Sequence, residues 1–113
     1  MKTLRFFDFE VYPNWWCVTF GDMPADYKFD ESIKDTFVTI TSDSEDYKRA
    51  MIAQMRQQGV CNVGYNIKQY DLTIANAIEC ELTPHMVHCV SNVLIQNHAL
   101  NIFQHFQIRL RMR

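Results

Sequence analysis

A short apolar run near the start of the chain, residues 4–11, carries two carboxylates at alternate positions, Asp8 and Glu10. Successive side chains of a β-strand point to opposite faces, so both acids are expected on one face of a strand. The apolar residues of the other face are Phe7, Phe9 and Val11. Two neighbouring negative charges are unfavourable unless a cation or water surrounds them. The stretch therefore predicts either a divalent-metal site or an edge strand whose acids face solvent.

The size and composition of the chain predict one globular domain, residues 1–113. It has 113 residues, of which 48% are hydrophobic and 21% are charged, which suits a single core. No apolar stretch has the length of a transmembrane helix, and the first residues lack a secretory signal, so we expect no membrane partner and a cytoplasmic location. The four cysteines form no Cys-x-x-Cys pair, which favours reduced thiols.

The formal net charge of −2 argues against a broadly basic nucleic-acid-binding protein. It is compatible with a metal-dependent nuclease, because an enzyme of that kind needs local acidity to hold its metal ions. The metal ions then supply the positive charge that meets phosphate.

The first half of the chain predicts three strands in a meander, followed by a helix and a fourth strand. The strands are expected at residues 4–11, 15–20, 37–41 and 60–65, with a turn around Pro13 that makes the first two a hairpin. Ser42 and Glu45 have the spacing of a capping box, which predicts a helix over residues 43–58. Gly59 is expected to end it with a left-handed residue.

The second half predicts two more helices. One is expected over residues 72–81, with Leu72, Ala75 and Ile78 on its buried side. Another should begin at Thr83 and Pro84, since threonine is a good cap and proline is favoured in the first turn. This order of elements predicts an α/β fold with a mixed sheet. It should also bring Asp71, just after the fourth strand, towards Asp8 and Glu10.

The carboxyl-terminal part alternates between apolar and polar residues from Phe106 to Arg113, which predicts a strand with one basic face. Such a strand, over residues 106–112, is expected either to lie at the edge of its own sheet or to pair with a second copy in a homodimer.

Two motifs resemble those of a known family. Phe7-Asp8-Phe9-Glu10 resembles the first exonuclease motif of the DEDD 3′–5′ exonucleases. The segment Gly64-Tyr65-Asn66-Ile67-Lys68-Gln69-Tyr70-Asp71-Leu72 resembles the second. The pattern is most similar to the proofreading domains of family-B DNA polymerases of bacteriophages. It covers residues 1–80, whereas residues 81–113 diverge.

The resemblance implies a ribonuclease-H-like fold and a two-metal site for Mg²⁺ or Mn²⁺. By this resemblance Asp8, Glu10 and Asp71 would be the catalytic metal ligands. Asn66 and Tyr70 would position the 3′ end of single-stranded DNA, and Tyr65 would stack or brace a base. For both tyrosines, packing in the core with a tethered hydroxyl is the competing interpretation. A phage-encoded protein of this kind would work in the cytoplasm of its bacterial host.

The family's third motif, Tyr-x-x-x-Asp or His-x-x-x-x-Asp, is absent. Asp71 is the last aspartate of the sequence and Glu81 its last acidic residue. The resemblance therefore implies either a truncated or weakly active proofreading module, or a domain completed by another chain. The competing hypothesis is a catalytically degenerate exonuclease fold that binds a host protein or nucleic acid.

Four zinc-ligand residue types lie close together in sequence: Cys80, His85, His88 and Cys89. Their spacing matches no common zinc module. The sequence therefore favours buried cysteines and partly exposed histidines over a metal site.

Overall fold

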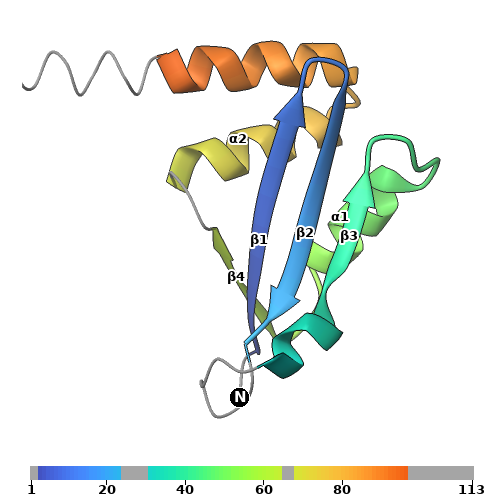
Figure 1. Ribbon diagram of the computed structural model, residues 1–113, viewed down its shortest axis with the longest axis vertical. Helices are drawn as coiled ribbons and strands as arrows, with labels where there is room; N and C mark the ends of the chain where they lie inside the picture. The colour runs from blue at the N-terminus through green and yellow to red at the C-terminus, as the bar shows by residue number, and fades with distance from the viewer. Residues whose placement is uncertain (1–2, 24–30, 65–67, 97–113) are drawn as a thin grey trace, which may run out of the picture.

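A computed structural model of the chain describes residues 3–23, 31–64 and 68–96. Its elements are β1 (Thr3–Tyr12), β2 (Trp15–Asp22), the 3-10 helix η1 (Glu31–Thr36), β3 (Val38–Thr41), α1 (Tyr47–Met55), β4 (Val60–Gly64) and α2 (Lys68–Glu79). Residues 84–96 form a further helix, drawn in orange across the end of the sheet in Figure 1.

The four strands form one mixed sheet in the order β3-β2-β1-β4. β1 pairs antiparallel with β2, which pairs antiparallel with β3, whereas β4 runs parallel to β1. The chain thus makes a three-strand meander, crosses through α1 and returns beside its first strand. This confirms the predicted α/β class, the mixed sheet and the order of the elements.

A two-residue loop sets the register of the central hairpin. Tyr12 pairs with Trp15, so that only Pro13 and Asn14 connect β1 to β2. Both strands are rich in aromatic and β-branched residues, which favour extended backbone. Because pairing continues regularly from the loop, the position of every side chain on the hairpin follows from this turn.

The hydrophobic core lies on one face of the sheet. β1 and β2 contribute large apolar side chains to it, and the helices close over them from behind the strands as drawn in Figure 1. The core residues are Phe7, Phe9, Trp16, Val18, Phe20, Ile40, Met51, Tyr70, Ile74, Ala75, Ala77, Ile78 and Val87. Among the described residues, no α-helix covers the opposite face, which we call the open face; the 3-10 helix η1 borders one end of it.

A buried arginine joins three elements at the covered face. Arg5 is 7% exposed, and its guanidinium donates to both carboxylate oxygens of Asp22 on β2, at 2.7 and 3.1 Å. It also donates to the carbonyl of Gln54 at 2.9 Å and to Oε1 of Gln57 at 2.8 Å. The charge is thus balanced and hydrogen-bonded, which a buried cation requires.

Helix α1 begins later than the capping box indicated. It starts at Tyr47, and Asp46 precedes it without a side-chain cap. Ser42 instead extends the edge of the sheet, because its hydroxyl accepts the N–H of Trp16 at 3.2 Å and its own N–H donates to the Trp16 carbonyl at 2.9 Å. Gly59 has the expected left-handed conformation, with φ of 82°, but it lies in the turn before β4.

The buried face of α2 also differs from the prediction at one position. Leu72 is 53% exposed, whereas Ala75 and Ile78 are buried as expected and Ile74 joins them. These three positions are spaced as one helical face, from which Leu72 points away.

The predicted cap of the following helix is confirmed, since the hydroxyl of Thr83 accepts the N–H of Met86 at 3.3 Å. Val87 of this helix is part of the core, and Val90 and Leu94 pack against it.

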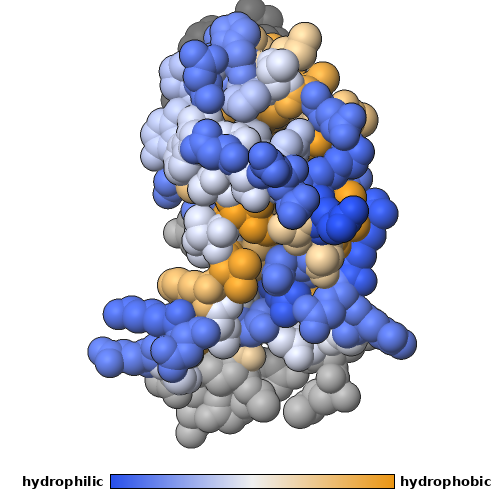
Figure 2. Space-filling view, turned by 90° about the vertical axis from the view of Figure 1, so that its right-hand side faces the viewer, coloured by the Kyte–Doolittle hydropathy of each residue, from blue (hydrophilic) through white to orange (hydrophobic). Residues whose placement is uncertain are grey.

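The edge of the molecule on the β3 side carries hydrophobic surface between hydrophilic zones (Figure 2). Phe37 and Val38, at the start of β3, are exposed apolar residues, at 52% and 38%. No helix among the described residues is long and apolar enough to span a membrane.

Candidate functional site

Asp8 and Glu10 lie side by side on the open face of the central strand β1. Their neighbours Phe7 and Phe9 are 4% and 5% exposed on the covered face, as strand alternation requires. Asp8 is partly buried and Glu10 is exposed. The sequence prediction of two acids on one face is therefore confirmed.

The hairpin places a second row of polar residues beside the acids. Asp8 stands opposite Thr19 on β2, and Glu10 stands opposite Cys17. The row continues to β3, where the hydroxyls of Thr19 and Thr39 are 3.0 Å apart. The open face thus offers carboxylates, a thiol and hydroxyls in adjacent strands.

The two carboxylates interact unfavourably with each other. Burial raises the pKa of Asp8 above its ordinary value of 3.8, and the negative charge of Glu10 raises it further. A cation bound between the two groups would reverse this effect, because it stabilises both charged forms.

Glu10 accepts hydrogen bonds from two neighbours. The Tyr12 hydroxyl donates to its Oε2 at 3.2 Å, and the Cys17 thiol lies 3.9 Å from the same oxygen. The hydrogen bond to Glu10, followed by the charge of Glu10, raises the pKa of Tyr12. Burial, followed by the same charge, raises the pKa of the Cys17 thiol. Both groups are therefore donors at neutral pH that help hold the Glu10 carboxylate in place.

Sequence reasoning did not single out Tyr12 or Cys17. The signal that could have found Cys17 is the hairpin turn: a two-residue loop at Pro13 and Asn14 pairs positions that are equally distant from it. Counting outward from the loop places Cys17 opposite Glu10.

Replacing Asp8 with asparagine is expected to stabilise the fold at neutral pH. A carboxyl whose folded-state pKa is raised binds its proton more tightly when folded, so its contribution to stability falls as pH rises from 3.8 towards the folded value. Asp8→Asn removes this loss. The free energy of unfolding, measured with urea at pH 4 and at pH 7, should therefore fall less between these two pH values for Asp8→Asn than for the unmodified protein.

The matched control is Asp35→Asn, which removes the same charge from an exposed position on η1. This variant should have the same free energy of unfolding as the unmodified protein at both pH values. An Asp8→Asn protein that is less stable at pH 7 would contradict the unfavourable pairing of Asp8 with Glu10.

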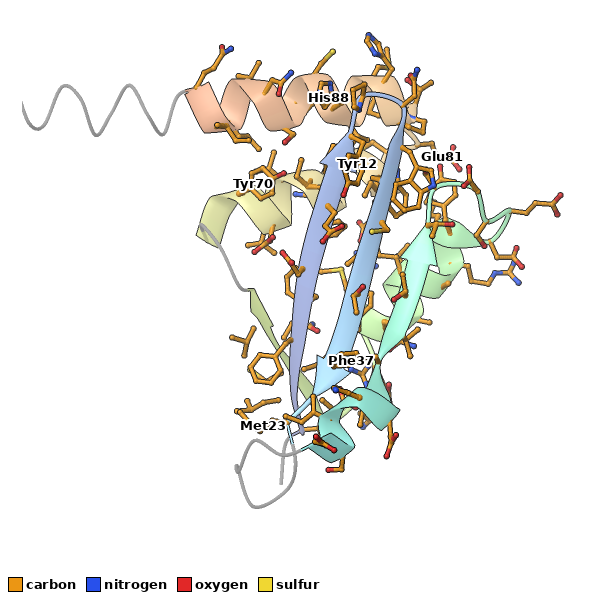
Figure 3. All side chains as sticks on the ribbon, in the orientation of Figure 1. Tyr12, Met23, Phe37, Tyr70, Glu81 and His88 are labelled. Carbon is orange, nitrogen blue, oxygen red and sulfur yellow. The ribbon has the colours of Figure 1, made fainter. Side chains whose placement is uncertain are left out.

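An apolar pocket of about 540 Å³ adjoins Asp8 on the same face. It is lined by Phe6, Phe7, Asp8, Thr19, Gly21, Ile33 and Phe37. A Cβ at position 21 would stand 2.8 Å from the ring of Phe37, so a side chain there would displace this exposed ring. Phe37, labelled in Figure 3, can therefore lean over the end of β2 only because position 21 is glycine.

Asp71 lies in the first turn of α2 and is 1% exposed. Its spacing from Ile74, Ala75 and Ile78 places it on the face of α2 that carries the core residues. Asp8 and Glu10 project from the opposite face of the sheet. Over residues 3–23, 31–64 and 68–96, no three His, Cys, Asp or Glu side chains come together as a metal-binding group. The structure thus brings together Asp8 and Glu10 on one strand face, and it buries Asp71 in the first turn of α2.

Tyr70 is 8% exposed, and its hydroxyl lies 2.8 Å from that of Ser91. Figure 3 shows Tyr70 between α2 and the helix of residues 84–96. This geometry corresponds to the core-packing interpretation with a tethered hydroxyl. The other two residues expected at the DNA end, Tyr65 and Asn66, lie outside the described residues.

Replacing Tyr70 with phenylalanine is expected to destabilise the fold by about 1 kcal/mol, since it leaves a buried serine hydroxyl without this partner. Ser91→Ala should have a similar effect. The free energy of unfolding of the double variant should fall by less than the sum of the two single losses, because both changes remove the same hydrogen bond. Urea unfolding of the three variants measures this, and additive losses would contradict a direct coupling between the two hydroxyls.

Only two of the four candidate zinc ligands interact. Sγ of Cys89 and Nε2 of His85 are 3.8 Å apart, one helical turn from each other. Cys80, like Cys89, is an exposed free thiol. The predicted burial of the cysteines is therefore wrong for these two residues, whereas Cys17 is buried.

Comparison of the chain with protein-family models, with curated proteins and with solved structures finds no match.

Proposed function

We propose that this protein is a metal-dependent 3′–5′ exonuclease-like domain with a ribonuclease-H-like fold, acting on the ends of single-stranded DNA. The observation that carries the proposal is the pair Asp8 and Glu10, held together on the open face of β1. The meander, the crossover and a fourth strand parallel to the first support the proposed fold, because they form a mixed α/β sheet with Asp8 and Glu10 on a central strand.

The donor set fits Mg²⁺ or Mn²⁺, since both ions prefer carboxylate and other oxygen ligands. Burial and the charge of Glu10 raise the pKa of Asp8, and a bound cation would offset both effects. Bound there, a divalent ion would polarise a phosphodiester and acidify a water molecule for attack on phosphorus. Asp8 and Glu10 would hold the ion, while Tyr12 and Cys17 would orient the Glu10 carboxylate through their hydrogen bonds.

Asp71 is tested separately. The motif resemblance makes it a ligand for a second metal, through water, and its side chain is 1% exposed in the first turn of α2. Asp71→Asn is therefore a separate arm of the experiment. If Asp71 is a ligand, the variant should lose activity while it keeps the unfolding midpoint of a folded protein.

The experiment is an exonuclease assay on 5′-labelled single-stranded DNA with Mg²⁺ or Mn²⁺. Stepwise shortening from the 3′ end is expected, and Asp8→Ala should reduce its rate roughly 100-fold or more, because the carboxylates of a metal site act jointly. Asp35→Ala, the matched loss of an exposed charge, should retain the rate. Mn²⁺ should also raise the melting temperature of the unmodified protein and not that of Asp8→Ala.

A second candidate function is binding without hydrolysis. The observation that favours it is the burial of Asp71, which is 1% exposed on α2, whereas Glu10 is exposed and Asp8 partly exposed on β1. A domain that binds without hydrolysis would retain labelled single-stranded DNA or a host protein. A protein that binds DNA but leaves its 3′ end intact at high protein concentration with either metal would contradict the exonuclease and support this second function.

A further inference from the structure

The apolar pocket beside Asp8 takes no part in the metal chemistry proposed above. Along β1 the pocket extends from Asp8 towards Phe6, away from Glu10, and on β2 it continues at Thr19 and Gly21. Its volume of about 540 Å³ lies within the range of small-molecule sites in proteins. Asp8 therefore stands between two features of the open face, which are the acidic pair and this pocket.

The walls of the pocket are apolar and partly aromatic. Phe6 on β1 and Ile33 on η1 are half-buried, and Phe37, just before β3, is exposed. Phe37 reaches the end of β2 because position 21 is glycine, where a Cβ would stand 2.8 Å from its ring (Figure 3). Side chains from three elements thus form a surface that suits the apolar body of a ligand.

A single negative charge stands beside these walls. Among the described residues that line the pocket, Asp8 is the only ionisable one, and Thr19 is the only other one with a polar side chain. The ion pairs formed among the described residues do not include Asp8, and Arg5 of the same strand is paired with Asp22 on the covered face. Because Asp8 is partly buried, water screens its charge less than it screens an exposed carboxylate, so a cation in the pocket would be attracted more strongly.

Apolar walls beside a carboxylate disfavour most classes of ligand. A phosphate or carboxylate would be repelled by Asp8 and Glu10. A neutral apolar molecule would fill the pocket but remove water from the Asp8 carboxylate without replacing its hydrogen bonds. A divalent metal ion would pair with the carboxylate but prefers oxygen ligands, which the walls lack. A molecule with an apolar body and a cationic end matches both parts of the pocket.

We propose that this pocket binds a small organic cation, an aromatic or branched aliphatic amine, whose apolar body contacts Phe6, Ile33 and Phe37 and whose ammonium group pairs with Asp8. An ammonium group has several N–H donors, so that one can bond to the Asp8 carboxylate and another to the hydroxyl oxygen of Thr19. The rings of Phe6 and Phe37 favour an aromatic body, because aromatic rings attract one another edge to face or offset.

Binding of an organic cation goes beyond the proposed exonuclease function, because it requires neither a metal ion nor DNA. The two sites nevertheless share one residue, since the acidic pair and the pocket both include Asp8. An organic cation in the pocket and a divalent ion on the acidic pair would therefore compete. This competition rests on the proposed function, whereas binding of the organic cation by itself does not.

Titration of the full chain with phenethylammonium in EDTA tests the proposal. Phenethyl alcohol is the neutral counterpart, because it carries the same ring with a hydroxyl in place of the ammonium group. Binding is followed by the shifts of backbone amide signals in nuclear magnetic resonance spectra. Phenethylammonium should cause saturable shifts at Gly21 and Phe37 with a Kd of roughly 1 mM or below, as expected for a ligand of few atoms. Phenethyl alcohol should bind at least about 5-fold more weakly, since it forms no charge-assisted hydrogen bond.

The variant Asp8→Asn separates the contribution of charge from that of shape. It keeps the size of the side chain and removes its charge, so it should bind phenethylammonium about 5-fold or more weakly. Its affinity for phenethyl alcohol should not fall. Asp35→Asn removes an exposed carboxylate of η1 outside the pocket and should bind both probes as the unmodified protein does.

The variant Gly21→Val tests the position of the site, because its side chain would occupy the pocket beside Phe37. Binding of both probes should fall about 10-fold or more, while the melting temperature reports whether the fold is kept. Phe37→Ala removes a wall at an exposed position and should also weaken both probes. Val38→Ala, an exposed neighbour outside the pocket lining, is its matched control.

Three results would overturn the proposal. They are the absence of saturable binding of phenethylammonium, equal affinity for the two probes, and unchanged affinity of Asp8→Asn for phenethylammonium. Amide shifts confined to residues outside the pocket would overturn it as well. Because the titration needs neither metal nor DNA, failure of the exonuclease assay would leave its outcome intact.

Discussion

Replacing Trp16 with alanine is expected to reduce the free energy of unfolding by about 3–5 kcal/mol, a large part of the stability of a domain of this size. Trp16 is 1% exposed in the core, and its ring meets that of Tyr47 edge-on, with 5.4 Å between the centroids. Truncation would leave a cavity between the sheet and α1. Urea unfolding monitored by far-UV circular dichroism measures the loss.

The neighbouring residue Trp15 provides the matched control, because it has the same side chain on the opposite face of the same strand. Trp15 is partly exposed, where it meets the ring of Tyr12 and donates to Asp43 at 2.7 Å. Trp15→Ala should therefore lose only about 1 kcal/mol. Equal losses for the two variants would contradict the assignment of a covered face and an open face.

Replacing Asp22 with alanine is expected to destabilise the protein by about 3 kcal/mol, because it leaves the buried Arg5 guanidinium without its counter-charge. The side chain of Arg5 is 8% exposed and that of Asp22 is 27% exposed. The carbonyl of Gln54 and the side chain of Gln57 would still accept hydrogen bonds, but neither carries a negative charge. Chemical denaturation of Asp22→Ala measures this loss.

An exposed ion pair serves as the control for Asp22. Lys48 and Glu81 approach to 3.4 Å with side chains that are 40% and 68% exposed. Lys48→Ala should change stability by less than about 0.5 kcal/mol, since water screens such a pair. The variant Arg5→Met tests the interpretation further: paired with Asp22→Ala it should recover part of the loss, because no buried charge then remains. Failure to recover any stability would show that packing, rather than charge, explains the effect.

The central hairpin and the faces of β1 could be predicted from sequence because local rules decide them. Alternation assigns Asp8 and Glu10 to one face, and a two-residue loop at Pro13 and Asn14 sets the pairing with β2. The same loop implies that Cys17 stands opposite Glu10, although only the structure shows their contact at 3.9 Å. Side-chain contacts depend on rotamers that alternation does not specify.

The start of α1 could not be predicted because two local interactions compete for one residue. Ser42 and Glu45 have the spacing of a capping box, but Ser42 hydrogen-bonds to the backbone of Trp16 across the sheet. A hydrogen bond between residues 26 positions apart in sequence thus replaces the expected one between residues three positions apart. Leu72 was misassigned for a related reason, since its burial depends on which face of α2 meets the sheet.

The sequence by itself determined the order of elements, the hairpin register and the pairing of two carboxylates on one strand face, because each follows from neighbours along the chain. Tertiary structure alone decided that α-helices cover the face opposite Asp8 and Glu10, that Asp71 is buried, and that Tyr70 meets Ser91. These features depend on how helices pack on a sheet. Packing is set by complementary surfaces that are distant in sequence, and no local pattern contains that information.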